Sequence, residues 1–296
     1  MRRWRRLVGL CLAGYLLLTA ALLLLEDRLI FRPQAGDGRW VEPPAQLHVQ
    51  EVWLQTDDGT SIHAWWCPCA KARGAALFCH GNSGNLSQRW HDVLLIRDIL
   101  ERSVLVFDYP GYGRSAGAPG EAGCYAAAHV AHHWLSQRVA AENILLIGQS
   151  LGGGVATELA SRRTCAGLVL FKTFTSIPDV AAHHLPFLPC GGLMRNRFDS
   201  AARVGRCHAP VFIAHGDRDR LIPPRHAELL FQAVTSQRRL VFLENQGHHG
   251  SFEPDLLHEV AAFFAAAVTE TGGRQFSPAF CGLHRGWSSW PSPPRA

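Results

Sequence analysis

The feature that most constrains how this chain can fold is a series of short, almost entirely apolar runs. Runs without polar alternation are typical of strands that are covered on both faces, as in a parallel sheet. Stretches with helical periodicity separate them, so the sequence predicts an α/β fold with a mostly parallel sheet flanked by helices. The six runs are residues 75–79, 104–108, 144–148, 168–171, 211–215 and 240–244.

We expect an antiparallel hairpin to precede these runs. Apolar and polar residues alternate over 47–55 and again over 60–66, on either side of Asp57-Asp58-Gly59. Asp-Gly supplies the positive φ angle that a tight hairpin turn needs. With these two strands the predicted sheet has eight.

The N-terminus carries a candidate membrane anchor. Four arginines lie within the first six residues, and the nineteen residues from Leu7 to Leu25 contain no charge. As a helix, this run would be about 28 Å long, close to the roughly 30 Å of a bilayer core. A cleaved signal peptide is the alternative, but Glu26-Asp27-Arg28 follows without an Ala-x-Ala site. We expect residues 1–27 to form an uncleaved single-pass anchor, with the arginines cytoplasmic and the remaining chain on the other side.

Composition divides the rest of the chain. Residues 28–46 are rich in Pro, Gly and polar residues and are expected to form a tether to a catalytic domain over 47–270. From residue 271 to 296 the composition shifts to Gly, Pro, Ser, Trp and Arg, which predicts a disordered tail. The net charge of +5 comes mostly from the first six residues, which argues against a nucleic-acid partner. The sequence does not indicate an oligomeric state.

The cysteines and histidines do not form a recognisable metal pattern. The nine cysteines are scattered, and Cys67 and Cys69 are too close in sequence to favour a bridge. Unpaired thiols are favoured, with a disulfide in an oxidising compartment as the alternative. The pairs His132-His133 and His183-His184 lack Cys or carboxylates at metal spacing. We therefore expect no metal and no cofactor.

A glycine-flanked serine follows the third apolar run. Gly148-Gln149-Ser150-Leu151-Gly152 lies between that run and a helical stretch. Strand, turn and helix are the context of a nucleophile elbow, in which a strained turn leaves space only for small residues on either side of the serine. The pattern also arises by chance, so it needs support from residues elsewhere.

Other predicted strands also end at polar groups. The carboxyl ends of parallel strands meet at one edge of a sheet, where active sites form. The run 211–215 leads to Asp217 and Asp219, and the run 240–244 leads to His248 and His249. The order serine, acid, histidine is the one expected for this type of sheet, which makes Ser150 the predicted nucleophile.

Two further blocks carry a family resemblance: His80-Gly-Asn-Ser-Gly-Asn85 and Asp108-Tyr-Pro-Gly-Tyr-Gly-Arg-Ser115. Over about residues 28–269 the chain resembles the α/β-hydrolase superfamily, in particular its membrane-anchored serine hydrolases. That group includes esterases, thioesterases and depalmitoylase-like enzymes. The resemblance implies cleavage of a carboxylic ester or thioester, of lipid or another acyl substrate, through an acyl-enzyme on Ser150. An acyltransferase, a peptidase or a non-catalytic binding protein of the same fold are the alternatives.

The resemblance also selects among the candidate residues. His248 directly follows a glycine, as the catalytic base does in the family, and Asp219 matches the acid that precedes an aliphatic residue and a proline. The backbone N–H groups of Asn82 and Leu151 would form the oxyanion hole.

A short lid is expected over residues 172–206. Its apolar side chains either line an acyl pocket or cap the core, and the sequence favours neither. Lys172 departs from the family pattern, which has an acidic or small residue there.

Overall fold

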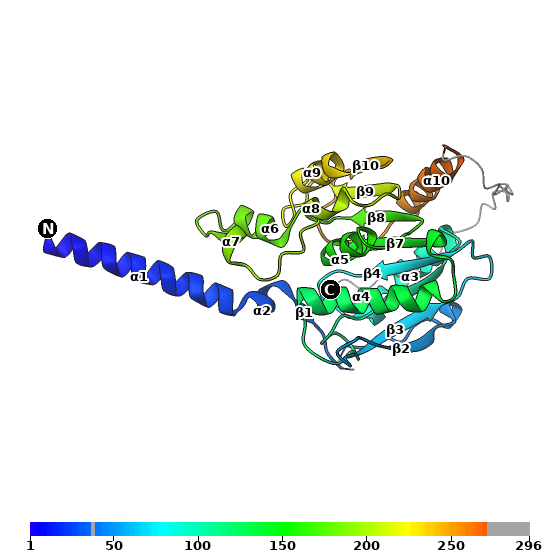
Figure 1. The fold of residues 1–296 in the computed structure, drawn as a ribbon, viewed down its shortest axis with the longest axis horizontal. Coiled ribbons are helices and arrows are strands. Elements are labelled where there is room, and N and C mark those ends of the chain that lie inside the picture. Colours follow the sequence, from blue (N-terminus) through cyan, green and yellow to red (C-terminus); the bar gives the residue numbers. More distant parts are fainter. Residues whose placement is uncertain (37–38, 271–296) are drawn as a thin grey trace.

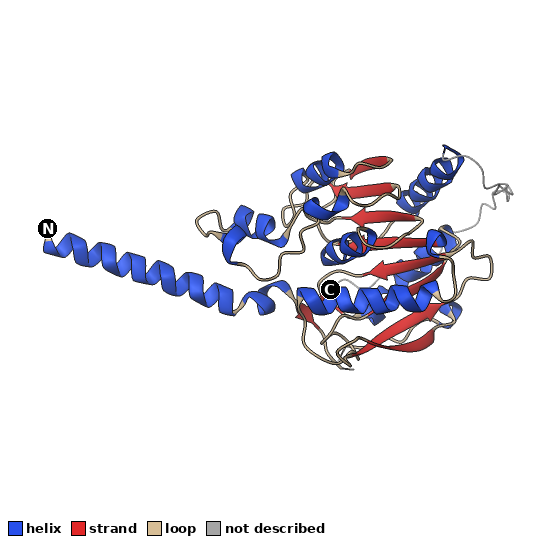
Figure 2. Cartoon of the chain, viewed as in Figure 1, coloured by secondary structure: helices blue, strands red, loops and turns tan. Residues whose placement is uncertain are grey.

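The computed structural model describes residues 1–36 and 39–270, and side chains as far as residue 267. A mixed eight-stranded sheet forms its centre (Figures 1 and 2). The strands are β2 (Gln50–Gln55), β3 (Ser61–Cys67), β4 (Ala75–Cys79), β6 (Ser103–Phe107), β7 (Ile144–Gln149), β8 (Gly167–Phe171), β9 (Val211–Gly216) and β10 (Arg238–Leu243).

The strand order is β10-β9-β8-β7-β4-β6-β3-β2. The six strands from β10 to β6 are parallel, whereas β3 is antiparallel to both β6 and β2. Every residue of β4, β6, β7 and β8 is buried, as expected of strands covered on both faces. The predicted mostly parallel sheet is therefore confirmed, and the hairpin forms its antiparallel edge.

Helices cover both faces of the sheet (Figure 1). One face is covered by α4 (Glu121–Ser136), α5 (Leu151–Ala160), α8 (Ala201–Val204) and α9 (Arg225–Ala233). The other is covered by α3 (Trp90–Ile99) and α10 (Pro254–Glu270). Short 3-10 turns at η1 (Ala45–Leu47), η2 (Leu86–Arg89) and η3 (Ala141–Asn143) complete the connections.

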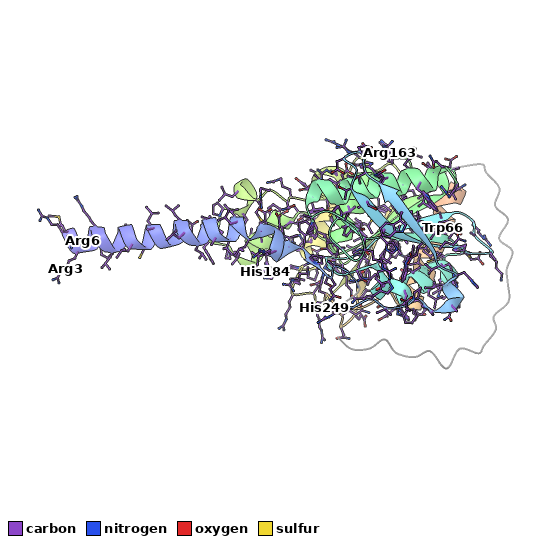
Figure 3. All side chains as sticks on the ribbon, turned by 90° about the horizontal axis from the view of Figure 1, so that it is seen from below. Arg3, Arg6, Trp66, Arg163, His184 and His249 are labelled. Carbon is purple, nitrogen blue, oxygen red and sulfur yellow. The ribbon has the colours of Figure 1, made fainter. Side chains whose placement is uncertain are left out.

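The N-terminal helix α1 (Arg2–Leu24) projects away from this domain, with none of its residues buried (Figure 1). Its 18-residue apolar stretch has a mean hydropathy of 2.4, so the helix is long and apolar enough to cross a membrane. A signal sequence passes the same test. Arg3 and Arg6 lie at the end of α1 farthest from the domain (Figure 3).

The segment after α1 differs from the expected tether. Helix α2 (Glu26–Ile30) is followed by β1 (Arg32–Pro33), which pairs in parallel with β5 (Ser83–Gly84). Phe31 between them is only 2% exposed and belongs to the core. Residues 28–36 are thus docked on the domain, because backbone pairing and the buried Phe31 side chain hold them. Neither contact can be recognised from the amino-acid composition of the segment. The predicted tail at 271–296 lies outside the described residues.

The lid segment contains α6 (Ile177–His184) and α7 (Cys190–Leu193), followed by α8. These two helices lie at the end of the domain from which α1 emerges (Figure 1). The eight cysteines within the described residues are free thiols.

Candidate active site

Ser150 lies in a strained turn between β7 and α5. Its φ angle is 51°, in a region of backbone conformation that residues other than glycine rarely adopt. A Cβ atom on Gly148 would lie 2.5 Å from the carbonyl oxygen of Gly152, and one on Gly152 would overlap the carbonyl of Cys79. Both glycines are therefore required by the close approach of backbone atoms, which is the physical basis of the elbow pattern.

Ser150, His248 and Asp219 form a continuous hydrogen-bonded series. Ser150 Oγ lies 3.0 Å from His248 Nε2, and His248 Nδ1 lies 2.8 Å from Asp219 Oδ2. The three residues come from the carboxyl ends of β7, β10 and β9. The structure brings neither His249 nor Asp217 into this series; the ring of His249 packs edge-on against that of His248.

Asp219 is buried and held by several donors. Its Oδ1 accepts hydrogen bonds from the backbone N–H groups of Leu221 and Ile222, and His215 Nε2 lies 3.4 Å from its Oδ2. Burial by itself raises the pKa of the Asp219 carboxyl, but hydrogen bonds from His215, His248 and Ile222 outweigh it and leave the pKa below its ordinary value. Asp219 therefore stays ionised and can hold the His248 ring in one orientation.

Two backbone N–H groups beside Ser150 have no protein acceptor within the described chain. These are the N–H groups of Leu151 and Asn82, the two predicted for the oxyanion hole. The loop of Asn82 passes close over the serine, since a Cβ on Gly81 would lie 3.6 Å from the Ser150 Cβ. The hydroxyl of Tyr112 donates a hydrogen bond to the Asn82 carbonyl and so holds this loop in place.

The two sequence blocks that carried the resemblance support this loop rather than the reacting atoms. The hydroxyl of Tyr109 donates to the backbone carbonyl of His80 at 2.7 Å. His80 Nε2 lies 3.3 Å from Asp108 Oδ1, and both side chains are fully buried. Asp108 Oδ1 also accepts from the Leu86 N–H at 2.8 Å.

Two residues near the site were not given a role by the sequence. His215 is the next-to-last residue of β9, and its Nε2 donates towards the Ile222 carbonyl and Asp219 Oδ2. Its place at the end of the predicted strand 211–215 was the available signal. Lys172 is 1% exposed, and its Nζ donates to the His249 carbonyl at 3.2 Å. Burial lowers the pKa of the Lys172 ammonium. In the sequence, Lys172 was noticeable only because it departs from the family pattern. The structure shows that its side chain holds the loop of His248 through the hydrogen bond to His249.

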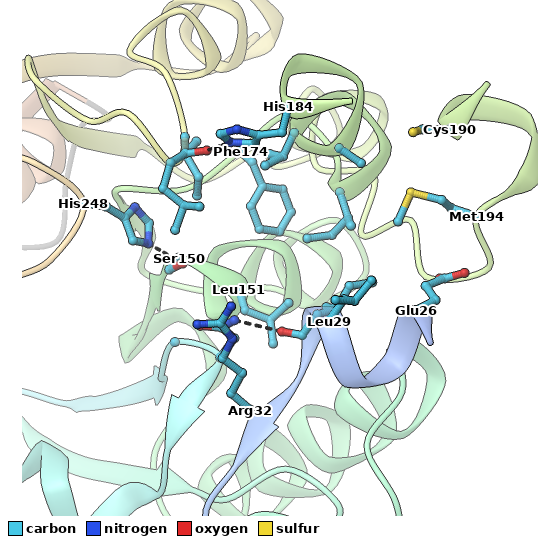
Figure 4. A pocket seen from close by; sticks show the side chains of 18 of the residues that line it. Glu26, Leu29, Arg32, Ser150, Leu151, Phe174, His184, Cys190, Met194 and His248 are labelled. Carbon is cyan, nitrogen blue, oxygen red and sulfur yellow. Dashed lines mark hydrogen bonds between the residues drawn. The ribbon is translucent and has the colours of Figure 1, made fainter. Parts of the chain in front are cut away.

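A cavity of about 660 Å³ opens at Ser150 (Figure 4). A volume of this size is typical of small-molecule sites. The lid contributes apolar side chains to its wall: Phe174, Ile177, Leu185, Leu188 and Met194. The sequence left open whether the apolar side chains of the lid line a pocket or cap the core. These five line the pocket, and two of them, Phe174 and Leu188, are also buried. Within the described residues, no group of three or more His, Cys, Asp or Glu is placed to hold a metal.

This arrangement can support nucleophilic chemistry. An imidazole at hydrogen-bond distance can accept the serine proton, and a buried carboxylate can stabilise the imidazolium that results. A largely apolar pocket wall strengthens these electrostatic interactions.

Comparisons with known proteins agree with the fold. The family profile described as the α/β hydrolase fold matches residues 76–189. An uncharacterised protein of Mycobacterium tuberculosis is 36% identical over 78% of this chain and 82% of its own length. The α/β hydrolase domain-containing protein WAV2 of Arabidopsis thaliana is 30% identical over 80% of this chain and 83% of its own.

Solved structures show the same architecture. A Pyrococcus furiosus esterase matches with a TM-score of 0.63 at 17% identity, over 80% of this chain and 97% of the esterase. A likeness at that identity shows the fold alone. Together with the identity to the Arabidopsis protein over most of its length, it leads to one conclusion: this chain belongs to the α/β-hydrolase superfamily.

Proposed function

We propose that this protein is a membrane-anchored serine hydrolase that cleaves carboxylic esters or thioesters of lipid or other acyl substrates. The observation that carries the proposal is the series Ser150–His248–Asp219, whose serine and histidine line a largely apolar pocket. Esterases among the structures of similar fold are consistent with it. Its place in the membrane-anchored, depalmitoylase-like group rests on the resemblance of its sequence blocks and on the apolar helix α1.

In the first half of the proposed reaction, Ser150 attacks the acyl carbonyl. His248 Nε2 takes the proton from Ser150 Oγ as the new C–O bond forms, and Asp219 stabilises the imidazolium. The negative charge moves to the carbonyl oxygen, where the N–H groups of Asn82 and Leu151 would donate to it. The intermediate then collapses, and His248 gives its proton to the departing alcohol or thiol.

In the second half, water replaces the leaving group. His248 takes a proton from the water as its oxygen attacks the acyl carbon. The bond to Ser150 Oγ then breaks, and the proton returns to that oxygen. The fatty or other carboxylic acid leaves, and the enzyme is restored without a cofactor.

The proposal is tested by labelling with a fluorophosphonate probe, which reacts with activated serines. The wild-type protein is expected to be labelled, and Ser150→Ala is expected to lose the label. Ser161→Ala is the matched control, because Ser161 lies at the other end of α5 and its hydroxyl donates to Glu158. Labelling that persists in Ser150→Ala would contradict the proposal.

A further inference from the structure

The cavity at Ser150 extends as far as the N-terminal helix. Its lining includes Thr19, Leu22 and Leu23 of α1. Residues at i, i+3 and i+4 share one face of a helix. Of the 23 residues of α1, these three are the ones partly shielded from solvent, and the others are exposed. One face of the candidate membrane helix thus forms a wall of the pocket.

The lid forms the opposite wall and is itself apolar where it meets α1. The ten residues from Leu185 to Met194 contain no charged side chain. Phe187 and Leu193 in this stretch are 57% and 45% exposed. The hydroxyl of Tyr15 donates to the Phe187 carbonyl at 3.0 Å. Because Tyr15 lies about 14 Å along the helix from Leu24, the lid tip stands beside the apolar run and not beyond its end.

The short helix α2 connects the lid to the loop of Asn82, which we call the oxyanion loop. Glu26 is 3% exposed, and its Oε1 accepts hydrogen bonds from the N–H groups of Arg195 and Asn196 at 3.1 and 2.7 Å. At the other end of α2, the Asn82 side chain donates to the Ile30 carbonyl at 2.8 Å, and the Arg32 N–H donates to the Asn82 carbonyl at 3.0 Å. Glu26 and Met194 face each other at the end of the pocket (Figure 4).

From these contacts we infer that the acyl chain of the substrate reaches Ser150 directly from the bilayer, through the gap between α1 and the lid. The substrates are then long-chain acyl esters or thioesters that are still held in the membrane. This inference rests on the proposed hydrolysis and on α1 lying in the bilayer. The acyl chain then lies along Thr19, Leu22 and Leu23, so that its contacts with lipid are replaced by contacts with the pocket wall. Its carbonyl carbon lies next to Ser150.

The experiment compares two alkyl fluorophosphonates, one with an ethyl and one with a hexadecyl chain, on the full-length protein in phosphatidylcholine vesicles. Leu23→Trp places a bulky ring in the pocket wall on α1. Leu24→Trp is the matched control, because its side chain is 82% exposed and lies outside the pocket lining. We expect the labelling rate with the hexadecyl probe to fall at least tenfold in Leu23→Trp. The ethyl probe should stay within twofold of the wild-type rate, and Leu24→Trp should change neither.

Thr19→Trp repeats the test one turn further along the same face, so the result does not depend on one variant. Equal hexadecyl rates in Leu23→Trp and Leu24→Trp would overturn the membrane route. So would a parallel loss of both probes in Leu23→Trp and Thr19→Trp, since an obstructed route for long chains leaves the short probe unaffected. Failure of hydrolysis itself has a different signature: the wild type is unlabelled by both probes, or Ser150→Ala is labelled.

Discussion

At the scale of single residues, the candidate site distinguishes between neighbours that the sequence presents as equals. His248 and His249 are adjacent, and Asp217 and Asp219 flank one residue, yet only one of each pair enters the series at Ser150. Which imidazole and which carboxylate turn inward depends on the turn geometry after β10 and β9. The family resemblance selected His248 and Asp219, whereas spacing alone left both pairs open.

Asp219→Asn is expected to lower kcat by about 10⁴-fold, because an amide in place of the carboxylate favours the wrong tautomer of His248. Asp217→Asn is the matched control and should change kcat by less than threefold. The measurement is turnover of a soluble p-nitrophenyl ester. Similar losses in both variants would show that the carboxylate bonded to His248 is not the one that matters.

The lowered pKa of Asp219 also makes a prediction about stability. A carboxyl group whose folded-state pKa lies below its unfolded value of about 3.9 stabilises the fold above that pH, and this stabilisation is lost as the pH falls towards the folded-state pKa. The difference in free energy of unfolding between wild type and Asp219→Asn should therefore be smaller at pH 3 than at pH 6. Urea denaturation at both pH values measures it, and a difference that does not shrink would be the contrary result.

At the scale of elements, the sequence predicted the central strands but not the docking of the N-terminal segment that follows α1. The apolar runs appear as β4 and β6 to β10, with ends displaced by up to two residues. In β4 and β6 to β9 the continuous apolar sequence reflects burial on both faces, whereas the edge strand β10 contains no buried residue. The docking of α2 and β1 escaped prediction. Their contacts are hydrogen bonds between groups far apart in sequence, and a five-residue helix has too few positions to show periodicity.

Two N-terminal deletions separate α1 from α2 in function. Removal of residues 2–24 leaves Glu26, Phe31 and Arg32 in place, so turnover of a soluble short ester should persist within threefold. Removal of residues 2–36 takes away the buried Phe31 and the hydrogen bonds to Asn82, and short-ester turnover should fall by at least tenfold. Equal activity of the two truncated proteins would show that α2 and β1 do not support the oxyanion loop.

At the scale of the whole molecule, the basic residues and the apolar helix predict how the chain lies in a membrane. If α1 is an anchor and its arginines are retained in the cytoplasm, we expect the hydrolase domain on the opposite side. A reporter enzyme that works only outside the cytoplasm, fused after residue 270, should be active, and one that works only inside should not. The reverse pattern would contradict this orientation. Release of the full chain from membranes by alkaline carbonate would contradict the anchor itself.

The proposed reaction requires that the acyl group of the substrate is carried on Ser150. The most direct measurement is mass spectrometry of the protein quenched with acid within milliseconds of mixing with a long-chain p-nitrophenyl ester. We expect a mass increase equal to the acyl group, located on the peptide that contains Ser150 and absent from Ser150→Ala. Product formation without an adduct, or an adduct on another residue, would contradict it.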